Sequence, residues 1–203
     1  MMRRFLTVLL MAALATLASS CGTARPSKYY ALELPAAVPA ASNTYPVALL
    51  VGRISAPHLY RDDRLVYRHG ETQFGTYEYH RWVEPPTDML ESMILRSLRS
   101  SGKYKTVQLQ ASNTQGDYIV RGRLYNLEEV SSPPVLARVT FELELYEVKS
   151  GTTVWTHFYS SEEPVTGKEV PDVVKAMERN VLRGLAESLA DLDHYFASRT
   201  ANK

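Results

Sequence analysis

Cysteine is nearly absent from this chain, because Cys21 is the only one among its 203 residues. A single thiol excludes a disulfide within the chain, so packing and hydrogen bonds must hold the folded part together in any compartment. An excess of charge of one sign is absent as well. Arg3 and Arg4 are two of the 23 basic residues, so 21 basic and 22 acidic residues remain after residue 20. This balance gives no support for a nucleic-acid-binding protein or for electrostatic adhesion to anionic lipid.

The chain also lacks a hydrophobic run long enough to cross a bilayer. Its longest uncharged apolar run, Phe5–Leu17, has 13 residues, whereas a membrane-spanning helix needs about 20. The run follows a basic start and precedes three small residues, Ala18-Ser19-Ser20. These three features are typical of a secretory signal peptide. We therefore expect residues 1–20 to be removed on export.

Cys21 stands directly after the small residues of this signal. The arrangement resembles a bacterial lipobox, although Ala18 occupies the position that usually holds leucine. In a lipobox the cysteine receives a diacylglyceryl group and becomes the new N-terminus, which would make the mature protein a palmitate-bearing lipoprotein. The alternative is an ordinary cleaved signal that has a cysteine close to it by chance. Because the charge balance offers no attraction to lipid, acyl chains would supply the membrane attachment.

The mature chain is expected to consist of a tether and one domain. Residues 21–27 are mostly small and polar and include Pro26, which is typical of a lipidated tether. The seven residues from Cys21 to Lys28 reach at most about 25 Å, so the domain would lie near the membrane. Residues 28–203 show no repeat and no second boundary, and their length suits a single domain with a sizeable core.

Hydrophobic periodicity predicts a mixed α/β fold for this domain. The apolar run Pro46–Ile54 is typical of a central strand, and Val135–Val148 shows the clearest alternation in the chain. Two amphipathic helices are expected, at Pro85–Ser101 and at Pro171–Ser198. We predict a two-layer α/β sandwich with an antiparallel-rich mixed sheet and both helices on one face. The remaining expected strands are Lys28–Leu34, Leu65–Arg68, Thr72–Trp82, Tyr104–Gln110, Asp117–Leu127 and Thr152–Tyr159.

No enzyme signature is recognisable. The nucleophile elbow, the P-loop, the dinucleotide-binding glycine motif and the zinc-protease motif are all missing, and the five histidines are scattered. We therefore expect neither catalysis nor a cofactor nor a metal. The acidic pairs Glu128-Glu129 and Glu162-Glu163 are interpreted as solvated strand ends. The pair Asp62-Asp63 has arginine neighbours, which favours a local cluster of ion pairs over a cation site.

Tyrosine is abundant, with 13 residues in the chain, and the aromatic side chains are densest in the stretch Tyr77–Trp82. Tyrosine and tryptophan suit surfaces that meet protein partners, but a tryptophan at the end of a strand commonly packs in the core. We expect Trp82 to be buried. Strand alternation then places Tyr79 and Arg81 on the opposite face, where they are candidates for contact with a partner.

Three stretches together resemble one family: Tyr29–Leu32, Ile54–Arg68 and Tyr79–Pro86. They are similar to the ABC-type transport auxiliary lipoproteins, the group that includes the lipoprotein of the paraquat-inducible Pqi envelope system. The resemblance extends over nearly all of the mature chain. It implies an α/β sandwich like the N-terminal domain of TolB.

The resemblance also implies a role in the cell envelope. Members work with an ABC transporter and a periplasmic protein of the mammalian-cell-entry type, in systems that move phospholipids or other hydrophobic molecules. Gly22 rather than aspartate follows the cysteine, which by the enterobacterial sorting rule favours the periplasmic face of the outer membrane. The oligomeric state stays open, with a homo-oligomer among the possibilities.

Three functions compete at this point. The first is a non-catalytic docking subunit, for which the candidate partner-binding residues are Tyr60, Arg61, Tyr79 and Arg81. The second is a lipid-binding carrier with a hydrophobic pocket between its helices and its sheet. The third is an envelope hydrolase that has no recognisable motif.

Overall fold

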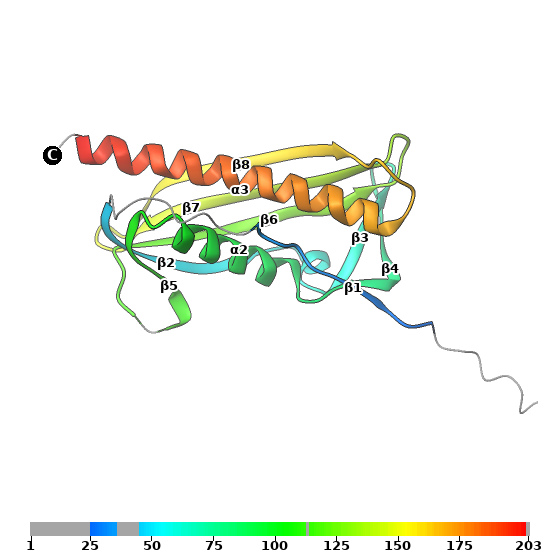
Figure 1. Ribbon diagram of the computed structural model, residues 1–203, viewed down its shortest axis with the longest axis horizontal. Coiled ribbons are helices and arrows are strands. Elements are labelled where there is room, and N and C mark those ends of the chain that lie inside the picture. Colours follow the sequence, from blue (N-terminus) through cyan, green and yellow to red (C-terminus); the bar gives the residue numbers. More distant parts are fainter. Residues whose placement is uncertain (1–24, 36–44, 113, 202–203) are drawn as a thin grey trace, which may run out of the picture.

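A curved, mixed sheet wraps around two helices in the computed structural model, which describes residues 25–35, 45–112 and 114–201 (Figure 1). The predicted signal peptide and Cys21 lie outside the described residues. The elements follow in the order β1 (Lys28–Tyr30), β2 (Tyr45–Ser55), the 3-10 helix η1 (His58–Tyr60), β3 (Arg64–His69), β4 (Gln73–Trp82), α2 (Pro86–Ser100), β5 (Tyr104–Leu109), the 3-10 helix η2 (Gln110–Ser112), β6 (Tyr118–Val130), β7 (Leu136–Glu147), β8 (Thr152–Pro164) and α3 (Val170–Ala201).

The sheet divides into two branches along β6. One edge of β6 pairs with β7 along nearly its whole length. Its other edge pairs first with β2, through Tyr118–Arg123, and then with β3, through Glu128–Val130. Beyond β2 lies β5, and beyond β3 lie β4 and β1. The crossover between β2 and β3, which contains η1, therefore leaves the sheet at the point where the branches separate.

The longest ladders are antiparallel, as predicted, and join β6, β7 and β8. Alternation in β7 follows the sequence pattern, because Val139, Phe141, Leu143 and Leu145 are at most 1 % exposed. These side chains face α3, which packs across β7 and β8. Burying each such side chain contributes about 1.5–3 kcal/mol, so this strand and helix form the central part of the core.

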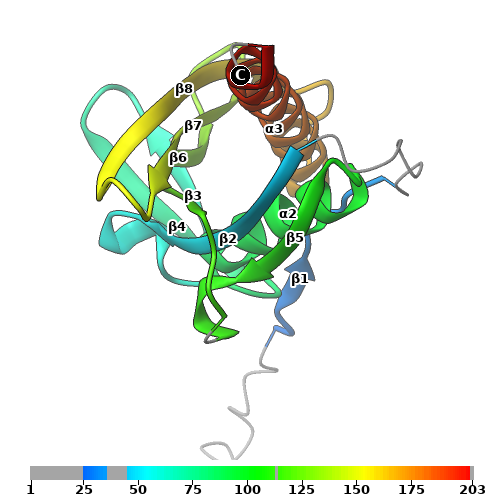
Figure 2. The ribbon, with the colours of Figure 1, turned by 90° about the vertical axis from the view of Figure 1, so that its left-hand side faces the viewer.

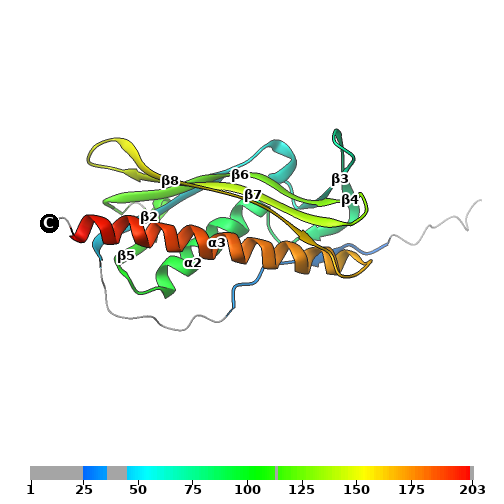
Figure 3. The ribbon, with the colours of Figure 1, turned by 90° about the horizontal axis from the view of Figure 1, so that it is seen from above.

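Both helices cover the same, concave face of the sheet, which confirms the predicted two-layer arrangement (Figure 2 and Figure 3). Helix α2 packs on β2 and β5, while α3 lies across β7 and β8. The segment after β1 runs between the two helices (Figure 1). There Leu32 is buried, and the Glu33 amide donates a hydrogen bond to the Glu178 carboxylate of α3, at 2.8 Å. The space between the helices is thus partly filled by the chain itself.

Element boundaries agree with the sequence except at two strands. The first expected strand, Lys28–Leu34, is regular only over Lys28–Tyr30, although the alternating burial of its side chains continues to Leu34. Strand β8 extends to Pro164, beyond the expected end at Tyr159, because its pairing with β7 continues to that residue. Gly102 has a φ of 63° just after α2, a backbone conformation that glycine adopts without strain.

Candidate functional site

A buried carboxylate lies where the sheet divides. Glu128 of β6 is 0 % exposed. Its Oε1 atom accepts hydrogen bonds from Arg68 Nε of β3, at 2.8 Å, and from Arg138 Nη1 of β7, at 3.3 Å. Its Oε2 atom accepts a hydrogen bond from the hydroxyl of Tyr60 in η1. A buried charge is costly unless it is paired and hydrogen-bonded, and here two cations and a phenol provide that compensation.

The neighbouring carboxylate is also buried, but it faces the helices. Glu129 accepts a hydrogen bond from the Tyr77 hydroxyl of β4, at 2.5 Å, and another from the Ser131 hydroxyl, at 2.7 Å. The interpretation of Glu128-Glu129 as a solvated strand end is therefore wrong. Pairing of β3 beyond the division of the sheet, together with the η1 segment, covers this part of β6. Of the other acidic pair, Glu162 is exposed, as expected, whereas Glu163 is partly buried and pairs with Arg179.

The two phenols that serve these carboxylates are held in their neutral, donating form. Burial raises the pKa of Tyr60 far above its ordinary value, and the hydrogen bond to Glu128 raises it further. The pKa of Tyr77 is raised in the same way, first by burial and then by Glu129. A protonated phenol is a hydrogen-bond donor, so both tyrosines stabilise the ionised carboxylates. Their role is structural support for the division of the sheet.

Tyr60 must therefore be removed from the candidate partner-binding residues. Its side chain is 3 % exposed and lies in the core, so it is not available at the surface. Arg61, the next residue, is exposed. Together with His58 and Asp62 it lines a surface depression of about 370 Å³. Tyr60 thus fixes the position of a loop that presents Arg61 to solvent.

Strand β4 confirms the predicted burial of Trp82, which is 1 % exposed. Arg81 is half-buried, and its guanidinium binds the Asp63 carboxylate at 2.7 Å. The Trp82 amide also donates to the Asp63 carbonyl, at 2.6 Å, so the η1 loop is attached to the end of β4. Asp62 lies 3.9 Å from Arg64. The aspartate pair is a cluster of ion pairs, as predicted, with Arg81 as an additional partner that the sequence did not indicate.

Tyr79 and Arg81 lie beside the segment that leads from the tether. Strand β1 pairs in parallel with β4, so that Tyr29 lies opposite Arg81. The phenol of Tyr79 is hydrogen-bonded to Glu78, which raises its pKa, and Arg25 is close enough to lower it. In Figure 1, β1 and β4 lie at the same end of the molecule, opposite the C-terminus. The surface formed by Arg61, Tyr79 and Arg81, here called the β4 surface, therefore lies at the end where the tether enters.

An aromatic cluster holds β1 on β4. The Tyr30 hydroxyl lies 2.8 Å from His80 Nδ1, and the two rings are stacked with centroids 5.7 Å apart. Tyr77 meets the same imidazole edge-on, at 5.6 Å. The pKa of His80 is below its ordinary value of 6.5 because burial and the Lys28 ammonium disfavour the imidazolium, while Glu169 acts in the opposite direction.

Attachment of β1 is therefore expected to depend on pH. Because the folded state lowers the pKa of His80, the unfolded chain binds more protons near pH 6, so the free energy of unfolding rises with pH. This stabilisation is complete above pH 6.5 and is lost as the pH falls from there to the lower pKa of the folded state. Urea unfolding of His80→Gln at several pH values should show a smaller dependence over this range than the unchanged chain. His58→Gln, at an exposed histidine of η1, is the matched control, and equal slopes for the two variants would contradict the assignment.

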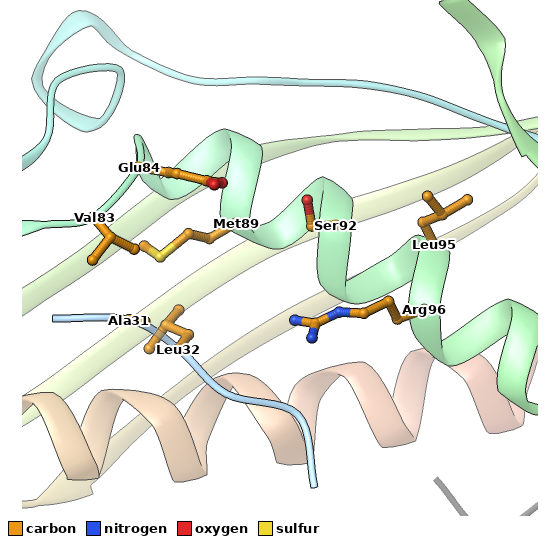
Figure 4. A pocket seen from close by; sticks show the side chains of 8 residues that line it. All are labelled: Ala31, Leu32, Val83, Glu84, Met89, Ser92, Leu95 and Arg96. Atoms are coloured by element: carbon orange, nitrogen blue, oxygen red, sulfur yellow. The ribbon is translucent and has the colours of Figure 1, made fainter. Parts of the chain in front are cut away.

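A second depression lies between α2 and the segment after β1 (Figure 4). Its volume is about 390 Å³, and its floor is apolar, with Leu32, Val83, Met89 and Leu95. Figure 4 shows the Arg96 guanidinium directed towards this floor from α2. Among the described residues Arg96 has no ion pair or hydrogen bond. The sequence did not indicate this depression, because the position of the segment after β1 is decided by its contacts with the helices.

Within residues 25–35, 45–112 and 114–201, no group of three or more histidine, cysteine, aspartate or glutamate side chains could hold a metal ion. The same residues include no helix of sufficient length and hydrophobicity to cross a bilayer. The Glu128 and Glu129 clusters are saturated by internal partners. Their side chains are therefore occupied in holding the fold.

Comparisons with known proteins agree with this architecture. The family model for the ABC-type transport auxiliary lipoprotein component matches residues 30–190. Comparison with curated proteins gives no match. Among solved structures, protein XCC0632 from Xanthomonas campestris, of the family DUF330, is 20 % identical with a TM-score of 0.74, covering 87 % of this chain and 100 % of that one.

Two further solved structures share the fold. One, described as an uncharacterized protein, is 15 % identical with a TM-score of 0.66, covering 83 % of this chain and 99 % of its own. The hypothetical protein CT253 from Chlamydia trachomatis is 8 % identical with a TM-score of 0.51, covering 76 % and 99 %. At these identities the likeness shows the fold alone.

Proposed function

Because this chain belongs to the ABC-type transport auxiliary lipoprotein family, we propose that it is the docking subunit of an ABC transport system in the cell envelope. In this proposal acyl chains on Cys21 hold the domain at the periplasmic face of the outer membrane. The β4 surface receives the periplasmic, mammalian-cell-entry-type component of the transporter. The transported molecules are lipids or other hydrophobic compounds, and the subunit itself catalyses no reaction.

The observation that carries this proposal is the pairing of β1 with β4. It brings Tyr79 and Arg81, which were selected from the sequence as contact residues, beside the first residues that follow the tether. A short tether and a contact surface at the same end of the domain would place the partner's tip next to the membrane. This is the arrangement that delivery of a hydrophobic molecule requires, because exposure of apolar surface to water is unfavourable.

The chemistry of the β4 surface supports a protein partner. Tyrosine and arginine are enriched where binding energy is concentrated in protein interfaces, and Arg61 is exposed. The ion pair between Arg81 and Asp63 fixes the guanidinium in one position before binding. A contact group that is already ordered loses less conformational entropy when a partner binds.

The carrier hypothesis receives less support from the structure. It required an apolar pocket between helices and sheet, where the side chains of β7 and α3 instead form a continuous core. The depression beside α2 has an apolar floor, but Glu84 and Arg96 also line it (Figure 4). Native mass spectrometry of the full chain, released gently from detergent, tests this alternative: a co-purified lipid that Met89→Trp removes would favour the carrier.

The docking proposal predicts which substitutions weaken the partner complex. Arg81→Ala and Tyr79→Ala, in the full lipidated chain in detergent, should each raise the dissociation constant for the mammalian-cell-entry-type component roughly tenfold or more. Loss of the partly exposed Arg81–Asp63 pair should lower the free energy of unfolding by about 1 kcal/mol or less. Biolayer interferometry measures the first quantity and urea unfolding the second.

Arg96→Ala is the matched control, because Arg96 is exposed near the far end of α2. Its dissociation constant should equal that of the unchanged chain. If the unchanged chain does not bind the component at all, the docking function is wrong. If it binds and both β4 variants bind equally well, the function stands and the β4 surface is the wrong location.

A further inference from the structure

The outer edge of β8 is the longest open strand edge among the described residues. Strand β8 spans 13 residues, Thr152–Pro164, and pairs only with β7. Outside that ladder, the backbone hydrogen bonds of the described residues include none made by β8. Asn180 Nδ2 binds one of its carbonyls, that of Ser161. An edge of this kind presents a row of unpaired N–H and C=O groups to which another strand can add.

The other two edges of the sheet are protected in ways that β8 is not. Strand β1 has three residues and includes Lys28, and β5 has six residues and includes Lys105. Short length and a lysine are common means of preventing strand addition. Residues 152–161 of β8 contain no lysine, arginine, aspartate or glutamate. Acidic residues occur only at the end of the strand, before Pro164.

Phe158, at the middle of β8, adds an exposed apolar side chain to this open edge. It is 60 % exposed, the highest value among the large hydrophobic residues of the described chain. Its neighbour Tyr159 faces α3 and binds Asn180, so Phe158 faces the opposite side of the sheet. There it contacts Tyr125, with ring centroids 6.1 Å apart. Since the helices lie on the other face, they do not cover it.

We propose that β8 pairs antiparallel with β8 of a second copy of this chain, around a two-fold axis at Phe158. The two sheets would join into one continuous sheet, and each Phe158 would lie opposite its symmetry mate. A two-fold contact uses the same patch on both copies, and aromatic pairs across antiparallel strands stabilise such a ladder. This inference does not depend on the proposed docking function.

The sequence of β8 is complementary to itself in this arrangement. Because Phe158 is the central residue of the strand, reversal of direction pairs all thirteen positions. Glu162 and Glu163 of one copy would then lie opposite the uncharged Thr153-Val154 of the other. Like charges opposite one another destabilise a ladder, and none meet here. This distribution of charge favours a second copy over a foreign strand as the occupant.

Charge exchange at Phe158 tests the interface. In detergent, light scattering after size-exclusion chromatography should show dimers of the full lipidated chain. Phe158→Glu and Phe158→Lys should each raise the dimer dissociation constant at least tenfold, because two like charges would then face each other. An equimolar mixture of the two variants should form dimers again. Val83→Glu, at another exposed apolar residue, should leave the dimer unchanged.

The single cysteine of the chain allows a second measurement. Phe158→Cys should form a disulfide between copies under mild oxidation, because residues opposite each other at the axis lie within disulfide distance. A monomeric unchanged chain at its highest soluble concentration would overturn the proposal. Dimers that persist in Phe158→Glu, or that do not cross-link through Phe158→Cys, would overturn it as well. Rescue by the mixed charges distinguishes loss of the interface from loss of folding.

Discussion

Replacing Glu128 by alanine is expected to lower the free energy of unfolding by about 3–5 kcal/mol, because it leaves buried cations without their partner. Arg68 and Arg138 both bind this carboxylate, and the Tyr60 hydroxyl donates to it. All three groups would lose a hydrogen-bond acceptor in a region from which water is largely excluded. Urea denaturation followed by circular dichroism measures the change. A small native domain has about 5–15 kcal/mol of stability in total, so the loss would be a large fraction of it.

Glu162→Ala is the matched control for this prediction. Glu162 also binds Arg138, at 2.6 Å, but its side chain is 41 % exposed. Loss of an exposed ion pair costs about 1 kcal/mol or less. Tyr60→Phe should have an intermediate effect of about 1–3 kcal/mol, because one buried oxygen of Glu128 loses a donor. Equal, small effects for Glu128→Ala and Glu162→Ala would show that the buried cluster does not hold the sheet together.

The same substitution should reach the β4 surface. Tyr60 and Arg61 belong to one short loop, and the bond from Tyr60 to Glu128 anchors that loop on β6. Release of this anchor would disorder the position of Arg61 and weaken the contact between Asp63 and Arg81. We therefore expect Glu128→Ala to weaken partner binding even where the protein remains folded. Binding measured at a temperature well below its unfolding midpoint tests this consequence.

Cys21→Ser is expected to release the protein from the membrane altogether. Serine cannot receive a thioether-linked lipid, and each buried CH₂ of an acyl chain contributes about 0.8 kcal/mol to membrane binding. Loss of all the chains would leave a nearly neutral mature protein with no electrostatic attraction to lipid. Incorporation of radiolabelled palmitate and fractionation of membranes after an alkaline wash measure this change.

Thr23→Ala provides the control for the lipidation experiment. It alters the tether two residues after the cysteine and retains the thiol, so labelling and membrane association should be unchanged. A Cys21→Ser protein that still incorporates palmitate, or stays with the membrane after the wash, would contradict the lipoprotein anchor. The folded domain should unfold with the same midpoint in both variants.

Much of the architecture was predictable because local periodicity reports which side of an element is buried. Alternation in Val135–Val148 correctly predicted the inward side chains of β7, and the helical stripes correctly predicted α2 and α3. The burial of Trp82 followed from its position at the end of a strand that enters a helix. The family was likewise recognisable from three short stretches of sequence, and its model matches residues 30–190.

The candidate site was predictable only in part, because its members come from distant positions. Tyr60 was chosen as a contact residue from its place in a polar loop, yet it binds a carboxylate 68 positions away. Glu128 and Glu129 looked solvated because an acidic pair near a strand end usually is. Their burial depends on β3, β4 and η1, which return to β6 from much earlier in the chain. The resemblance to the N-terminal domain of TolB stays a prediction.

The amino-acid sequence by itself determined the export signal pattern, the lack of disulfides, the faces of strands and helices, and the two-layer class. These properties depend on neighbouring residues and on the periods of two and 3.6 that secondary structure imposes. Only the tertiary structure decided that β6 divides the sheet, that Tyr60 supports rather than contacts, and that the edge of β8 stays open. Such features depend on which strands pair, and many long-range contacts must form together before any one of them is stable.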